Sequence, residues 1–373
     1  MTGKKFDLSV SLVLLVIFML ACQAVNIGTA PIVATASPVA TDVPATATSA
    51  PPTITPTPPE LPPVLQTSIL NPIDTPHVYI KDTCQYLKNK WDASKASPGT
   101  VVMIIMIKGI YKGYVEEGGG INRNDLKSLM AELKRQNFEA INTKQLLGFL
   151  QENAYIPQRS VMIIQDRNHR YENFDEHLGP YWRDWGWPVV NAWISDPNTS
   201  ETVWAENIGL EKTGFVDHQA SGVQFGTILD ETSPEKIINR ELQGSMDGFQ
   251  RFEKKPIAFI WQGGGFTQKT VDAASQAGYQ LGFTSNTRGP VMYNWIPLAD
   301  DLDPARPTSI PEGKMGNPLM TLPRYWPSGA ILEIDNVRAI SKQAIAYAEA
   351  SKETEMKYYD IVCVRTYGQI PAP

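Results

Sequence analysis

The stretch PIAFIWQGGGFTQKTVDAASQAGYQLGFT, residues 256–284, decides the fold class of this chain. It begins with a short run of β-branched and aromatic residues and passes through a glycine-rich turn into a segment of helical composition. A second apolar run follows Gly278. A glycine just past a helical segment is a common C-terminal cap, and short apolar runs are typical of buried strands. The stretch therefore predicts a strand, a helix and a second strand in succession.

The same alternation continues towards the N-terminus. Further runs that predict buried strands are Val101–Ile107 and residues 160–164, 188–194 and 214–218. Residues 124–136 place their leucines and methionine on one helical stripe. Strands that alternate with helices are typical of parallel α/β folds. Because no glycine-rich dinucleotide fingerprint follows the first strand, the pattern favours a (β/α) barrel over an open sheet.

The N-terminus predicts export. Lys4 and Lys5 precede an apolar run at residues 8–20, which at about 13 residues is too short to span a bilayer but fits a secretory signal. The following Met-Leu-Ala-Cys resembles the bacterial lipoprotein processing box, in which Cys22 is lipidated. We expect residues 1–22 to be a lipoprotein-type signal and the protein to be secreted and anchored to the outer face of a bacterial membrane. An ordinary signal peptide or an uncleaved anchor is the alternative.

Composition divides the rest of the chain into two parts. Residues 23–76 are rich in threonine, proline and alanine and predict a disordered stalk, because they carry few large apolar side chains. Residues 77–373 predict one folded domain. The net charge is −6 and no run of five basic residues occurs, so nucleic acid is not an expected partner.

Two cysteines, Cys84 and Cys363, lie in the predicted domain. Outside the cytoplasm they could pair and tie the two ends of the domain together. The alternative is two buried thiols, because DIVCVRTY, residues 360–367, has the composition of a strand in which Cys363 is a small core residue. The sequence leaves both interpretations open.

Polar residues follow three of the predicted strands: QDRNH at residues 165–169, DHQASGVQF at 217–225 and WQGGGF at 261–266. The carboxyl ends of barrel strands share one face, so we expect these loops to meet in one cleft. Around them, over about residues 99–284, the chain resembles the polysaccharide deacetylase family, the NodB-homology domain of type-four carbohydrate esterases. Residues 156–174 resemble the strand and Asp-Asp-Gly motif, 209–225 the His-Ser/Thr-x-x-His motif, and 256–284 the third loop; LPRYW at 322–326 is a weaker likeness.

The resemblance implies a distorted (β/α) barrel that acts on N-acetylated sugars. In the family, one Asp and two His hold a divalent, zinc-like metal, a second Asp acts as base on the metal-bound water, and a late His acts as acid. A metal lowers the pKa of its bound water and polarises the amide carbonyl, and a base removes the proton. Carbohydrate is the partner that the resemblance implies.

The functional positions depart from the family pattern. In one register Asp166 takes the base position and Arg167 replaces the metal-binding Asp; shifted by one residue, Asp166 is the metal ligand and a glutamine replaces the base. The two His positions fall on Ser221 and Phe225, which cannot replace imidazole. No histidine follows His218, so the late acid is missing. We therefore expect no cofactor and no bound metal.

The alternative is a metal site rebuilt from other residues, for which the candidate ligands are Asp166, His169, Asp217 and His218. For substrate binding, the third loop offers Trp261, Gln262 and Gly264. Arg167 could bind an acidic sugar or form a structural ion pair. Aromatic residues crowd residues 181–193, where they form either a sugar-contacting surface or one packed helix end.

Three functions compete at this point. The first is a surface lipoprotein that binds extracellular or cell-wall carbohydrate, with metal-dependent deacetylation lost or impaired. The second is an active hydrolase of amide bonds in N-acetylated polysaccharide, with Asp166 as its catalytic residue. The third is a structural or protein-interaction module.

Overall fold

The structure is a computed structural model that describes residues 57–115, 118–166, 169–304 and 310–371. A curled parallel sheet forms its centre. Among the described residues the strands of this sheet are β2 (Val101–Ile107), β5 (Glu139–Ala140), β6 (Arg159–Gln165), β7 (Val189–Trp193), β8 (Val216–Ala220), β9 (Ala258–Ile260) and β10 (Leu281–Phe283). They pair in parallel in the order β10-β9-β8-β7-β6-β2, and β5 adds to β6. The predicted barrel-type α/β fold is confirmed.

Helices connect the strands. They are α1 (Thr83–Trp91), α2 (Arg123–Arg135), α3 (Thr143–Glu152), α4 (Tyr171–His177), α5 (Gly179–Trp185), α6 (Glu201–Lys212), α7 (Glu235–Gly248), α8 (Gln268–Ala277), α9 (Pro327–Val362) and α10 (Val364–Tyr367). In α8, Thr267 caps the N-terminus and Gly278 caps the C-terminus at a φ of 100°. The opening stretch thus folds as β9, α8 and β10, as its pattern predicts.

The gap between the first and last strands is bridged by residues 322–325. The backbone N–H of Leu322 donates to Gly282 in β10, and Thr284 donates back to Leu322. At the other side, the N–H of Tyr325 donates to Ile104 in β2, and Met106 donates to Tyr325. This segment pairs too briefly to count as a strand, so the barrel is closed but distorted.

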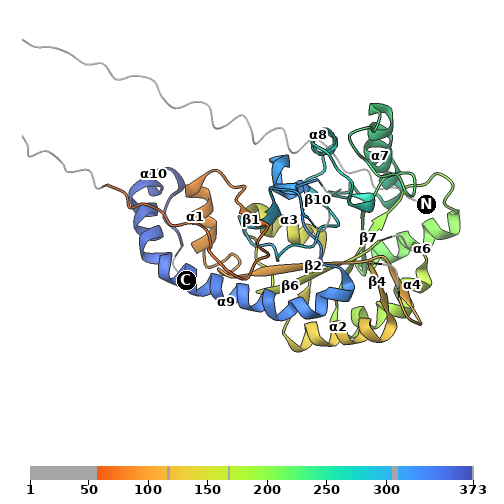
Figure 1. The fold of residues 1–373 in the computed structure, drawn as a ribbon, viewed down its shortest axis with the longest axis horizontal. Helices are drawn as coiled ribbons and strands as arrows, with labels where there is room; N and C mark the ends of the chain where they lie inside the picture. Colours follow the sequence, from red (N-terminus) through yellow and green to blue (C-terminus); the bar gives the residue numbers. More distant parts are fainter. Residues whose placement is uncertain (1–56, 116–117, 167–168, 305–309, 372–373) are drawn as a thin grey trace, which may run out of the picture. The chain divides into compact units, whose positions relative to one another are not determined.

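Alternate residues of β2 enter different parts of the core, as the pleat of a strand requires. Met103 and Ile105 pack in the cluster that contains the apolar faces of α2 and α9, which Figure 1 shows side by side along the sheet. Val102 and Ile104 join a second cluster with inward residues of β6, β7, β9 and β10. The whole strand is therefore buried, and this explains its unbroken apolar sequence.

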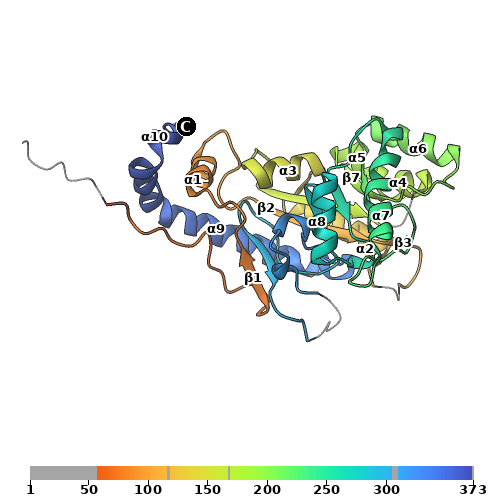
Figure 2. The ribbon, with the colours of Figure 1, turned by 90° about the horizontal axis from the view of Figure 1, so that it is seen from above.

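The two cysteines form a disulfide between α1 and the end of α9, across 279 residues of sequence. Figures 1 and 2 both show α1 and α10 together at this end of the domain. The prediction of a strand at residues 360–367 was wrong, because residues 360–362 continue α9 and Cys363 caps it. The continuing helix of α9, whose buried face includes Tyr359, outweighs the β-branched character of Ile361 and Val362.

The folded part of the chain extends N-terminal to residue 77. Leu65 is buried, and Val64, Ile69 and Leu70 pack against the core. Residues 74–77 form β1 (Asp74–His77), which pairs antiparallel with β11 (Ile296–Ala299). The last part of the predicted stalk, from residue 61, thus lies on the domain, because its few apolar side chains are spaced to reach the core. Residues 1–56, which include Cys22, lie outside the described residues.

Candidate functional site

A cleft of about 110 Å³ lies at the carboxyl ends of the barrel strands, as in other barrels of this type. It is built from the loops after β2, β6, β8 and β9, so the three predicted loops do meet. Its apolar lining from the strand ends includes Ala192, Ile194 and Ile260. The other lining residues are Lys108, Asp166, Ser221, Phe225, Gly226, Ile228, Trp261, Gln262 and Gly263.

Asp166 reaches the cleft from the end of β6 and is held by Arg324. The guanidinium Nη1 of Arg324 lies 2.9 Å from Oδ1 and 3.1 Å from Oδ2 of the carboxylate. The Arg324 side chain is 1 % exposed and also donates through Nε to the carbonyl of Thr284. Because Arg324 belongs to the segment that closes the barrel, this ion pair joins the closure to the cleft.

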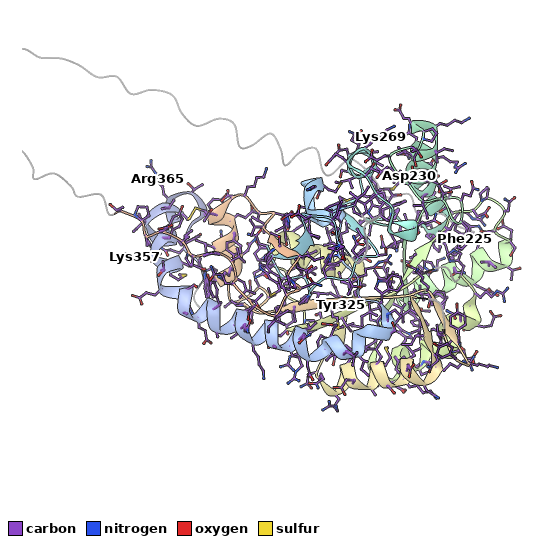
Figure 3. All side chains as sticks on the ribbon, viewed as in Figure 1. Phe225, Asp230, Lys269, Tyr325, Lys357 and Arg365 are labelled. Carbon is purple, nitrogen blue, oxygen red and sulfur yellow. A yellow bond between two sulfur atoms is a disulfide. The ribbon has the colours of Figure 1, made fainter. Side chains whose placement is uncertain are left out.

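The two positions at which the resemblance expects histidines, Ser221 and Phe225, hold no imidazole. The hydroxyl of Ser221 is buried and donates to the carbonyl of Ile260 over 2.8 Å. The side chain of Phe225 is 59 % exposed at the mouth of the cleft, and Figure 3 shows it at the surface of the molecule. One position is thus used within the fold and the other presents an aromatic ring.

The loop that carries Phe225 is held by two side chains. Gln262 donates through Nε2 to the carbonyls of Ser221 and Gln224 and accepts through Oε1 from the N–H of Gly226. From α7, the buried carboxylate of Glu241 accepts from the N–H groups of Val223 and Gln224. Gln262 lines the cleft, and its amide supports this loop.

Trp261 also lines the cleft, but its side chain is 1 % exposed. Its indole N–H donates to the carbonyl of Met320 over 2.9 Å, and its ring packs edge-on against Phe259. Gly264 follows at a φ of +74°, and a Cβ there would lie 2.0 Å from Oγ of Ser285. The substrate-binding roles of Trp261, Gln262 and Gly264 remain predictions, and the packing of Trp261 leaves little of its ring for a ligand.

Asp217 and His218 serve the fold. They lie in the first half of β8, roughly 10 Å along the strand from Ser221. His218 is fully buried, with Nδ1 2.9 Å from Glu211 and Nε2 3.0 Å from Asn207. Asp217 pairs with Lys254. Although burial raises the pKa of the Asp217 carboxyl, Lys254 and Thr143 hold that pKa below its ordinary value.

The fourth residue of the rebuilt cluster is engaged elsewhere. The ring of His169 lies tilted against that of Trp193 with the ring centroids 4.4 Å apart, and its Nε2 accepts from the N–H of Ile194. No three His, Cys, Asp or Glu side chains among the described residues are grouped to hold a metal ion. The side chains around the cleft therefore do not fit the family's zinc-like site. Arg167 lies outside the described residues.

The aromatic cluster at residues 181–193 packs inside the domain. Trp182 stacks on Phe215, and Trp185 meets Trp187 edge-on. Trp187 is buried and donates to Glu139. None of these side chains lines the cleft. This agrees with the interpretation of a packed helix end, because α5 ends at Gly186 in the left-handed conformation.

Three residues of the site were missed from sequence. Lys108 follows β2 directly and lies with its ammonium 4.8 Å from the ring centroid of Trp326. Arg324 lies in LPRYW, the segment of weaker likeness to the family, for which the sequence suggested no function. Glu241 lies in a helix with no motif, so only its three-dimensional contacts identify it.

Comparisons with known proteins agree with this fold. No family model matches the sequence, and no curated protein matches it. Among solved structures, the deacetylase PplD of Streptococcus pyogenes in complex with acetate superimposes with a TM-score of 0.50 and 15 % identity, covering 65 % of this chain and 99 % of that one. A polysaccharide deacetylase from Bacillus cereus superimposes with a TM-score of 0.47 and 12 % identity, covering 64 % of this chain and 68 % of that one. IcaB from Ammonifex degensii superimposes with a TM-score of 0.45 and 11 % identity, covering 66 % of this chain and 98 % of that one. The chain therefore has a polysaccharide deacetylase-like fold.

Proposed function

We propose that this chain is a surface lipoprotein that binds extracellular or cell-wall carbohydrate in the cleft, with metal-dependent deacetylation lost or impaired. One observation carries the proposal. Where the resemblance expects two metal-binding histidines, the cleft has a serine bonded to the backbone and an exposed phenylalanine. The serine and the phenylalanine provide no imidazole to bind a metal, and the exposed phenylalanine ring provides a surface on which a sugar can pack.

The chemistry of the cleft supports carbohydrate as the ligand. The ring of Phe225 and the side chain of Ile228, which is 53 % exposed, provide an apolar rim. The C–H face of a sugar packs on such aromatic surfaces. Asp166 and Lys108 add polar groups that can orient hydroxyl groups. The fold neighbour with a TM-score of 0.50 is a deacetylase whose structure contains acetate, which is compatible with a ligand that carries acetylated groups.

The anchor is proposed from the N-terminal sequence. Its support is the apolar run that ends at Cys22 and the Thr/Pro-rich segment behind it. Among the residues described here, no helix combines the length and the apolar character needed to cross a bilayer. Labelling of producing cells with radioactive palmitate tests the anchor: we expect a labelled chain that is lost in Cys22→Ala, and an unlabelled wild type would refute lipidation.

Metal analysis of the purified full chain tests the loss of metal chemistry. We expect less than stoichiometric zinc, nickel or cobalt, and no release of acetate from chitin oligomers or peptidoglycan fragments. Stoichiometric metal whose removal by chelator abolishes acetate release would overturn the proposal in favour of the active hydrolase.

Binding to a glycan array tests the cleft. We expect binding that survives chelator and falls about tenfold in Phe225→Ala, since loss of one stacking ring costs on the order of 1 kcal/mol or more. The matched control is Tyr155→Ala. Tyr155 is 74 % exposed and precedes β6, at the opposite end of the barrel strands. Equal binding by both variants would refute the cleft as the site, and a chain that binds no glycan would favour the protein-interaction module.

A further inference from the structure

The carboxylate of Glu241 in α7 is bound to the rim of the cleft without lining the cleft. The residue is 1 % exposed and is absent from the described residues that form the lining. Its Oε2 accepts from the N–H of Val223 over 2.7 Å and from the N–H of Gln224 over 3.0 Å. Phe225, which lies at the mouth of the cleft, is the next residue of the chain. Glu241 is thus fixed to the backbone that carries the exposed ring.

The two oxygens of this carboxylate have different partners. Whereas Oε2 faces the loop, Oε1 accepts from Nε and Nη2 of Arg240 over 2.8 and 2.6 Å. The side chain of Arg240 is 40 % exposed, so the charge of the buried carboxylate is balanced from the surface of the molecule. A buried carboxylate is costly unless it is paired and hydrogen-bonded, and Glu241 meets both conditions. Loop support and charge balance therefore depend on separate atoms.

Gly222 shows that the loop is shaped around two supporting side chains. It has a φ of +96°, and a Cβ there would lie 2.6 Å from Oε2 of Glu241 and 2.9 Å from Nε2 of Gln262. Only glycine leaves room for both side chains and adopts this conformation without strain. Gln262 binds backbone groups of residues 221, 224 and 226, and Glu241 binds those of residues 223 and 224. The two side chains together hold the loop along its length.

The second apolar residue of the rim is also fixed by its surroundings. Ile228 lies directly on the glycine-rich loop after β9, where a Cβ at Gly263 would be 2.8 Å from its Cδ1 and a Cβ at Gly265 would be 2.3 Å from its Cγ2. The rim formed by Phe225 and Ile228 is therefore shaped before any ligand arrives. A preformed surface loses less conformational entropy on binding, which favours affinity.

We propose that Glu241 is a positioning residue for carbohydrate binding. It does not touch the ligand; by holding the N–H groups of Val223 and Gln224 it keeps the ring of Phe225 in the orientation that binds sugar. This inference rests on the proposed function. Gln262 does not replace Glu241, because Gln262 binds other atoms of the loop. Once the carboxylate is removed, the loop populates other conformations, and the apparent affinity falls with the fraction of molecules in the binding conformation.

Calorimetric titration of the purified full chain tests the proposal. The probe is a chitin hexamer or, where the glycan array shows tighter binding, the tightest-binding oligosaccharide of the array. Glu241→Met removes the acceptor and should weaken binding about tenfold. Glu241→Gln keeps one acceptor oxygen for the loop and should restore affinity to within about threefold of the wild type. The control Arg240→Ala removes the partner of the other oxygen and should bind as the wild type does.

A double-variant cycle shows whether Glu241 acts through the ring. In a Phe225→Ala background, Glu241→Met should weaken binding little further, because the ring that it positions is absent. Gly222→Ala places a Cβ against Oε2 of Glu241, so it should reproduce the loss of affinity and replaces Glu241→Met if that variant does not fold.

Hydrogen–deuterium exchange of the ligand-free chain separates positioning from general destabilisation. We expect faster exchange in Glu241→Met in peptides that cover residues 221–228, and unchanged exchange in β2 and β6. Unchanged affinity in Glu241→Met, an equal loss with and without the ring of Phe225, or faster exchange across the whole domain would each overturn the inference alone. A wild type that binds no oligosaccharide would refute the proposed function and this inference with it.

Discussion

Replacing Asp166 by asparagine tests whether the carboxylate at the cleft is committed to holding Arg324. In the folded chain both carboxylate oxygens lie within 3.1 Å of one guanidinium nitrogen, and the arginine side chain is 1 % exposed. Asparagine keeps the shape and one acceptor but removes the charge. The variant therefore leaves a buried guanidinium whose remaining side-chain partner is the carbonyl of Thr284.

The expected cost follows from burial. Two unit charges about 3 Å apart attract by roughly 5 kcal/mol at an effective dielectric of about 20, and breaking a buried pair costs about 3–5 kcal/mol. Asp166 is 14 % exposed, so water offsets part of the loss. We expect Asp166→Asn to lower the free energy of unfolding by about 3 kcal/mol.

The assay is urea unfolding at neutral pH, applied to Asp166→Asn, Arg324→Met and the double variant. Since removing both charges leaves none unpaired, the double variant should be about 2 kcal/mol more stable than the sum of the single effects predicts. The exposed α9 pair Asp335 and Arg338 is the control, and its cycle should give less than about 0.5 kcal/mol. Additive effects at Asp166 and Arg324 would refute the reasoning and leave Asp166 available for other chemistry.

Three further predictions concern the rest of the domain. The double variant Cys84→Ala and Cys363→Ala should lose up to about 5 kcal/mol of unfolding free energy, because the crosslink restricts 279 residues of the unfolded chain; alkylation of both cysteines without reductant would contradict it. Burial raises the pKa of Asp74 from 3.8 to about 6, so the native state binds the proton more tightly and stability should fall by about 3 kcal/mol as pH rises from about 4 to about 6. Denaturant unfolding across this pH range should show the fall in unfolding free energy in the wild type but not in Asp74→Asn. An equal pH dependence of the unfolding free energy in the two proteins would be inconsistent with a raised pKa of Asp74. Gly264→Ala forces a side chain into a left-handed backbone against Ser285 and should cost about 2 kcal/mol in denaturant unfolding, whereas Gly316→Ala, with open space around it, should cost about half as much; equal losses would show that the Ser285 contact is unimportant.

Much of the fold could be predicted because the relevant signals are local. The run at Val101–Ile107 is apolar at every position, since both faces of β2 are covered. Gly278 ends α8 because a left-handed residue is needed there. The prediction failed at residues 360–367, where Ile361 and Val362 end a 36-residue helix and Val364 begins the next one. Local composition cannot reveal that these residues continue helix α9, whose buried face includes Tyr359.

The site was harder to predict than the fold. The three strand-end loops were correctly placed together, because parallel strands put their carboxyl ends on one face. The partners of individual side chains were not predictable. Arg324 lies 158 residues from Asp166, and Gln262 lies 36 to 41 residues from the loop atoms that it binds. The Asp217–His218 pair attracted attention by composition, yet its partners, Glu211, Asn207 and Lys254, belong to the packing of β8.

The sequence by itself determined the alternation of strands and helices, the order of the polar loops and the presence of serine and phenylalanine, not histidine, at positions 221 and 225. These features depend on residue type and spacing, which the chain carries directly. Only the tertiary structure decided that Ser221 turns its hydroxyl to the backbone, that Phe225 faces solvent, and that Glu241 holds the loop between them. Each of these depends on which distant segments closure of the barrel brings together, and burial, charge and hydrogen bonding are properties of that assembly.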